Sequence, residues 1–156
     1  MIQRIQSLYL FVVAVACTLL FFFPMIIYVS ATKGTYKLFA SAMISYSDIK
    51  GPLFFWETFP LLLLVLISLV LALVTIFLYK KRRIQNLLVS INLLINVVLI
   101  ALVFLLYSRL FEHRLQIISE YQFGMYIPLI SLVFLVLASR AIRKDEAMVR
   151  STDRLR

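Results

Sequence analysis

Four long apolar segments dominate the pattern of hydrophobic and polar positions along the chain. They cover about residues 5–29, 59–79, 84–107 and 123–139. A helix needs about 20 apolar residues to cross a hydrocarbon core of about 30 Å, and the first three segments meet that length without a charged residue or a histidine. The fourth segment is shorter, but Arg140 directly after it can extend its charge toward the headgroups. The pattern therefore predicts four transmembrane helices.

The apolar positions are continuous rather than alternating, which argues against the strands of a membrane barrel. We therefore expect an all-α membrane protein, an antiparallel bundle of four helices that forms a single domain over residues 1–156. The first outer loop, about residues 30–58, carries many β-forming residues between Gly34 and Gly51. This composition predicts a short antiparallel β-ribbon within the loop.

Basic residues indicate how these helices would lie in a membrane. The "KKRR" link at residues 80–83, six residues of the tail 140–156 and Arg4 place 11 of the 16 basic residues on one side. The positive-inside rule then puts both termini and the link in the cytoplasm. Because topology accounts for most of the net charge of +9, we do not expect specific nucleic-acid binding.

The basic tail is expected to continue the fourth helix into the cytoplasm, with its cations along one stripe. Two interpretations stay open: contact with anionic lipid headgroups, at about 1 kcal/mol per cation, or docking of an acidic or nucleic-acid-bearing partner at the membrane. The candidate contacts in the link and the tail are Lys80, Lys81, Arg82, Arg83, Arg140, Arg143, Lys144, Arg150 and Arg154.

The third segment carries the strongest polarity inside the predicted membrane region. Gln85, Asn92 and Asn96 follow one another at spacings of seven and four residues, which places them on one helix face. An unpaired amide in hydrocarbon is costly, so this face should point into the bundle or toward a partner. The alternative is a path for a polar solute.

Residues that would support catalysis are sparse. The chain has no paired carboxylates, no serine–histidine arrangement, no glycine-rich phosphate loop and no ionisable residue inside the predicted spans, so we expect no enzymatic activity, cofactor or metal. Cys17 is the single cysteine; "AVAC" resembles a lipoprotein cleavage signal, but the apolar run continues and favours a packing role. A weaker hypothesis is an outer-surface sensor that uses Glu112, His113 and the aromatic residues of the first outer loop.

Two short sequences recur at matching places. "RIQ" opens the first and the third segment, and "LISLV" occurs at residues 66–70 and again at 129–133. These repeats suggest that one helical hairpin was duplicated. Leucine-rich segments also match by chance, so duplication stays a hypothesis.

The two ends of the chain resemble a known group of proteins. The start "MIQRIQSLYL", the "FFFP" at residues 21–24 and the closing "RAIRKDEAMVRSTDRLR" are similar to an uncharacterised family of four-span membrane proteins from Bacteroidota-type bacteria, a domain of unknown function. The resemblance implies a multi-pass protein of the bacterial inner membrane. It implies no activity and no catalytic or binding residue.

Together these observations favour a non-enzymatic accessory or scaffold subunit of a larger membrane assembly. We expect it to contact the lipid bilayer and a protein partner or a second copy of itself. The alternative is an oligomeric small transporter or channel that uses the Gln85, Asn92 and Asn96 face of the third helix.

Overall fold

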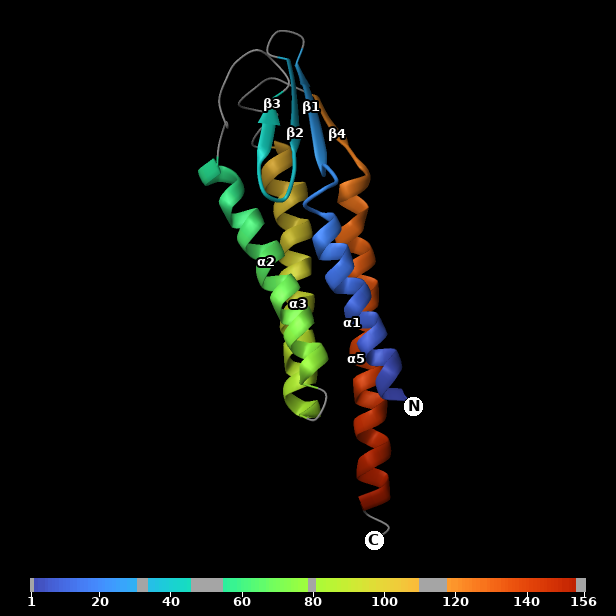
Figure 1. The fold of residues 1–156 in the computed structure, drawn as a ribbon. Helices are drawn as coiled ribbons and strands as arrows, with labels where there is room; N and C mark the ends of the chain where they lie inside the picture. The colour runs from blue at the N-terminus through green and yellow to red at the C-terminus, as the bar shows by residue number, and fades with distance from the viewer. Residues whose placement is uncertain (1, 31–33, 46–54, 79–80, 110–117, 154–156) are drawn as a thin grey trace.

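The fold was analysed in a computed structural model that describes residues 2–30, 34–45, 55–78, 81–109 and 118–153. Its four main helices in these ranges are α1 (Ile2–Leu19), α2 (Phe55–Phe77), α3 (Arg82–Ala101) and α5 (Tyr126–Asp153). Figure 1 shows that the chain ascends in α1 and α3 and descends in α2 and α5. Both α1 and α3 pack against α2 and α5, so neighbouring helices are antiparallel. The expectation of a mostly helical chain with four main helices is confirmed.

The helices carry apolar side chains outward and polar side chains inward. Within the described residues, three helices are long and apolar enough to cross a membrane: Thr58–Phe77, Arg82–Tyr107 and Phe123–Val149. Phe77 is 78% exposed and Leu94 is 64% exposed, whereas the amides Gln6, Gln85, Asn92 and Asn96 are at most 3% exposed. A water-soluble protein shows the opposite distribution. These features are compatible with a membrane protein.

The first predicted helix was wrong beyond Leu19. α1 ends there, and after a turn the chain enters strand β1 (Ile26–Ser30). The proline at position 24 has no backbone N–H and disfavours helical geometry in the residue before it. The residues that follow, "IIYVS", are mostly β-branched or aromatic and suit a strand.

β1 belongs to a four-stranded antiparallel sheet at one end of the helices, which corrects the all-α prediction (Figure 1). The sheet also contains β2 (Gly34–Leu38), β3 (Met43–Ser45) and β4 (Ile118–Tyr121), in the order β3-β2-β1-β4. The expected ribbon corresponds to the β2–β3 pair and is confirmed. The sequence pattern did not indicate that β1 and β4 would extend it.

One face of the sheet is buried and fastened to the adjacent end of α3. Ile26, Tyr28 and Leu38 on this face have no exposed surface. The Tyr28 hydroxyl donates a hydrogen bond to the backbone carbonyl of Tyr107, at 3.0 Å. That carbonyl lies in a π-helical segment, η1 (Leu102–Tyr107), which continues α3 toward the sheet. A π-helix shifts the helical hydrogen-bond pattern from i→i+4 to i→i+5 over this segment.

Two other boundaries differ from the sequence prediction. α2 begins at Phe55 rather than near residue 59, and α5 runs without a break from Tyr126 to Asp153. The expected helical continuation of the tail is therefore confirmed as far as Asp153. α5 also projects beyond the other helices at the end opposite the sheet (Figure 1). Glu112 and His113 lie outside the described residues.

Replacing Gly124 with alanine should destabilise the fold. A Cβ atom there would clash with the Pro24 carbonyl oxygen and would lie 2.8 Å from the carbonyl oxygen of Phe23. Because these are backbone atoms, they cannot move aside cheaply, and we expect a loss of about 1–3 kcal/mol in the free energy of unfolding. Thermal unfolding in detergent measures it, with Ala147→Ser on the exposed side of α5 as the control. Equal melting temperatures for the two variants would contradict this account.

Candidate functional site

The polar side chains of the helix interior gather in a group that we call the buried polar cluster. It consists of Cys17 from α1, Ser68 from α2, and Asn92 and Asn96 from α3. Each of these residues is at most 2% exposed. The cluster thus joins three helices, and it contains two of the three amides that the sequence placed on one helix face.

Asn92 and Ser68 form the centre of the cluster. The Ser68 hydroxyl donates to Asn92 Oδ1 at 2.7 Å, and Asn92 Nδ2 donates to the Ser68 carbonyl at 3.1 Å. Both ends of the Asn92 amide are therefore bound to a single residue of α2. This two-point contact fixes the rotation of α3 relative to α2.

The remaining hydrogen-bonding capacity of the Ser68 hydroxyl is also used. Asn96 Nδ2 lies 3.0 Å from Ser68 Oγ, and it also lies within 3.1 Å of the carbonyl and the Oδ1 of Asn92. Cys17 Sγ lies 3.4 Å from Ser68 Oγ. Since the hydroxyl proton goes to Asn92, the thiol is the donor in this contact. The hydroxyl thus donates once and accepts twice, which satisfies it fully.

The two "RIQ" glutamines make equivalent contacts near the end of the helices opposite the sheet. Gln85 Nε2 donates to the Thr75 carbonyl of α2 at 3.3 Å, and Gln6 Nε2 donates to the Ala141 carbonyl of α5 at 3.1 Å. Both glutamines are buried, at 1% and 3% exposure. Each one ties its helix to the backbone of a neighbour. Gln6 was not among the candidate residues, although the repeated "RIQ" was a signal for it.

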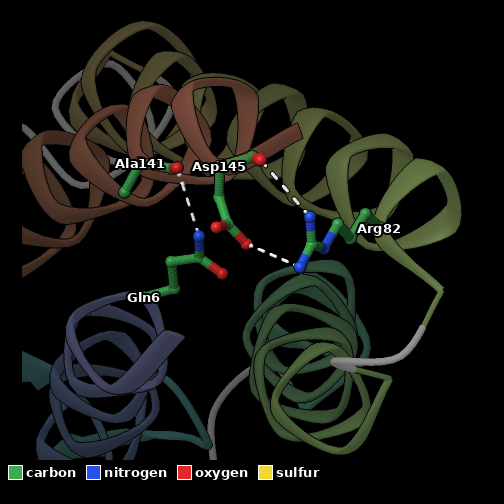
Figure 2. A network of polar contacts seen from close by, with 4 residues as sticks. All are labelled: Gln6, Arg82, Ala141 and Asp145. Atoms are coloured by element: carbon green, nitrogen blue, oxygen red, sulfur yellow. Dashed lines mark hydrogen bonds and ion pairs between the residues drawn. The ribbon is translucent and has the colours of Figure 1, made fainter. Parts of the chain in front are cut away.

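One of the basic residues predicted to contact lipid or a partner, Arg82, is half-buried and paired within the chain. Arg82 forms an ion pair with Asp145, with Nη2 and Oδ2 3.3 Å apart, and its Nη1 donates to the Asp145 carbonyl at 3.3 Å. Figure 2 shows Arg82 and Gln6 reaching α5 from different helices at neighbouring turns. α5 is thereby connected to α3 through Asp145 and to α1 through Ala141.

The remaining basic residues that the structure describes in the link and the tail lie at the end of the helices opposite the sheet, and we call this set the basic end. The exposed members are Lys81, Arg83, Arg140, Arg143 and Lys144. Lys80 and Arg154 lie outside the described residues, and Arg150 is placed only as part of the α5 backbone. Among the described residues, no ion pair joins Lys81 or Arg83 to an acidic side chain.

Ser131 is the counterpart of Ser68 in the second "LISLV", and it behaves differently. Its hydroxyl is fully buried on the inner face of α5 and has no hydrogen-bond partner in the described part of the chain. Counted from the Gln6–Ala141 contact, Cys17 lies about 16 Å along α1 and Ser131 about 15 Å along α5. The unpaired hydroxyl therefore lies at about the depth of the buried polar cluster without joining it.

No metal site is indicated. Within the ranges that the structure describes, no three histidine, cysteine, aspartate or glutamate residues lie close enough together to hold an ion. The buried polar cluster offers one thiol, one hydroxyl and two amides that already bind one another. The cluster therefore serves to connect α1, α2 and α3 through hydrogen bonds, and we call this connection the interhelical lock.

Apolar helices with buried polar contacts between them define the class: a helical protein with features compatible with a membrane protein. The chain matches the family described as a domain of unknown function (DUF4293) over residues 2–155, and it belongs to that family. The resemblance of the two ends of the sequence to a domain of unknown function is thereby confirmed. No curated protein matched the chain.

Alanine at the two serines of the "LISLV" repeats should have opposite effects. Ser68→Ala removes the hydroxyl that three side chains contact, and we expect a loss of about 1 kcal/mol in the free energy of unfolding. Ser131→Ala removes a buried hydroxyl without a partner in the described chain, so stability should stay equal or rise. Thermal unfolding of the two variants side by side in detergent measures both effects. Equal destabilisation would show that the lock is not centred on Ser68.

Proposed function

We propose that the chain is a non-enzymatic accessory or scaffold subunit of a larger assembly in the bacterial inner membrane. In this proposal the four helices cross the membrane, and the basic end lies in the cytoplasm together with both termini. Support for the orientation comes from the excess of cations at the end of the helices opposite the sheet.

The shortest helix needs its own physical account. The 18 residues of α1 rise about 27 Å, slightly less than the hydrocarbon thickness of about 30 Å. After α1, the Phe23 N–H donates to Leu19 and the Met25 N–H donates to Leu38, and β1 pairs with a strand on each side. Backbone outside a helix is tolerated at membrane depth where its polar groups are satisfied in this way. The turn after α1 therefore completes the first crossing in our proposal, and the sheet, with Glu120 exposed on β4, lies at the outer surface.

The observation that best supports the scaffold role is that the polar face of α3 is buried against α2 rather than exposed on the outside of the helices. Gln85, Asn92 and Asn96 are all buried and all bind α2, directly or through each other. In hydrocarbon, where water does not compete, such bonds stiffen the packing of two helices. These polar side chains thus make the packing of α2 and α3 rigid. The apolar faces that point outward remain available for contact with lipid and with a partner.

The rival function, an oligomeric transporter or channel lined by the same face of α3, has less support. A path between protomers would need Asn92 and Asn96 to face away from α2, which would break the two-point contact with Ser68. Replacing both asparagines with leucine distinguishes the two functions. A transporter loses transport while its assembly persists; a scaffold loses thermal stability and partner binding together.

Cysteine labelling should report the proposed orientation. We expect Glu120→Cys on β4 to react with a membrane-impermeant maleimide in intact spheroplasts, and Lys144→Cys on α5 to react only after permeabilisation. Cys17, 2% exposed, is the internal control and should stay unlabelled in both conditions. The opposite labelling pattern would reverse the orientation, and labelling of both sites in intact spheroplasts would exclude a membrane between them.

Photo-crosslinking in native membranes should identify the partner. A photoreactive amino acid is placed at exposed positions on three helices, Phe11 on α1, Val70 on α2 and Val133 on α5, with the buried Val13 as the control. We expect adducts with one or a few membrane proteins from one helix face, identified by mass spectrometry. Adducts only with a second copy of this chain would favour the transporter. Adducts with lipid alone would contradict the accessory role.

A further inference from the structure

We propose that the outward side of α3 next to the basic end binds one anionic phospholipid of the cytoplasmic leaflet. Its phosphate-containing headgroup lies at Lys81 and Arg83, and an acyl chain lies along the adjoining part of α3. This inference rests on the proposed function, because that function places the beginning of α3 at the cytoplasmic surface.

The first observation is a groove on α3. It has a volume of about 550 Å³, and it is lined by Arg83, Asn86, Leu87, Ser90, Ile91 and Leu94. These positions recur at spacings of three and four residues, so they form one strip along the helix. The strip begins with a cation and ends, about 16 Å further along, in leucine.

The second observation is a pocket at the beginning of the same strip. It has a volume of about 590 Å³, and it is lined by Lys81, Arg82, Arg83, Ile84 and Val149. Arg83 lines both hollows, so the pocket and the groove adjoin. A basic pocket that continues into an apolar groove is complementary to a phospholipid, in which a charged headgroup is followed by an acyl chain.

Charge explains why an anionic headgroup fits this pocket. Arg82 is paired with Asp145, and Glu146, the next acidic residue of α5, is also engaged in a contact. Lys81 and Arg83 are exposed and have no acidic partner within the described chain. The pocket therefore presents two uncompensated positive charges. Basic pockets at the cytoplasmic surface bind anionic headgroups for this reason.

The polar residues of the groove explain why the second part of the ligand is apolar. Ser90 Oγ donates to the Asn86 carbonyl of its own helix at 3.0 Å, and Asn86 Oδ1 accepts from Ser139 Oγ at 3.3 Å. These groups are already engaged inside the chain. Leu87 and Leu94, in contrast, are 59% and 64% exposed. An acyl chain can cover this apolar surface because it needs no hydrogen-bond partner there.

Native mass spectrometry of the full-length protein, released from detergent, tests this proposal. The probes are phosphatidylglycerol and phosphatidylethanolamine with identical acyl chains, and the first should bind preferentially as a single molecule. Lys81→Gln with Arg83→Gln should weaken phosphatidylglycerol binding about fivefold for each cation removed. The matched control, Lys37→Gln with Arg109→Gln, removes two cations at the sheet end of the molecule and should leave that binding unchanged.

A groove variant tests the acyl chain separately. Ser90→Phe fills the groove and should weaken both lipids, and glycerol phosphate, which has the headgroup chemistry without the chains, should not compete. The proposal is overturned if both lipids bind equally to the parent protein, if the control pair of variants loses as much as Lys81→Gln with Arg83→Gln, or if glycerol phosphate competes fully. A photoreactive residue at Leu94 that crosslinks to a protein helix instead of a lipid would overturn it as well.

Failure of the lipid site and failure of the proposed function give different results. If cysteine labelling supports the cytoplasmic position of Lys144 while lipid selectivity is absent, only the lipid site is excluded. If labelling places Lys144 outside, the orientation on which both depend is excluded. Thermal unfolding of each variant, compared with the parent protein, shows that a loss of binding does not come from unfolding.

Discussion

The hydrogen bonds between Asn92 and Ser68 are the contact on which much of this structure depends. An apolar helix can rotate against another apolar helix at little cost, because every face offers a similar surface. The Asn92 amide removes that freedom, since it binds both the hydroxyl and the carbonyl of Ser68. Once α3 is turned in this way, Gln85 falls against the end of α2, and the strip from Arg83 to Leu94 faces outward. The interior lock and the outward groove are thus two consequences of one constraint.

The sequence predicted the helices and the polar face of α3 from length and spacing, and the structure buries that face. It did not predict which helix the face would meet. α2 is apolar around its whole circumference, so periodicity does not mark the side that carries a partner. Thr58, Ser68 and Thr75 interrupt its described length, but a serine or threonine is common in such helices and marks no particular contact. Likewise, Arg82 and Lys81 are neighbours in one basic run, and only the position of α5 determines that Arg82 has an acidic partner while Lys81 has none within the described residues.

The main error, the length of the first helix, has a related cause. Hydropathy measures how apolar a segment is, and β1 is as apolar as the helix before it. What distinguishes them is that the backbone of β1 finds hydrogen-bond partners far away in the chain, in β2 on one side and β4 on the other. Pro24 was the local signal that the helix would end, and its neighbourhood is further fixed by the close approach of Gly124. Long-range strand pairing is the part of the fold that local patterns describe least.

The two repeated sequences behave differently in the structure, which a simple duplication would not predict. The "RIQ" copies make equivalent contacts, and the "LISLV" copies do not. The "RIQ" glutamines of α1 and α3 each bind the backbone of a neighbouring helix, so the same residue solves the same problem twice. The "LISLV" serines do not: Ser68 satisfies three side chains, while Ser131, at about the same depth, satisfies none in the described chain. One lock between α2 and α3 is enough to set their rotation, and a second on α5 is unnecessary because Arg82 and Gln6 already tie α5 to its neighbours. Ser68 and Ser131 therefore differ because the rotation of α2 against α3 is fixed by the Ser68 hydrogen bonds, whereas α5 is already fixed by its contacts with Arg82 and Gln6.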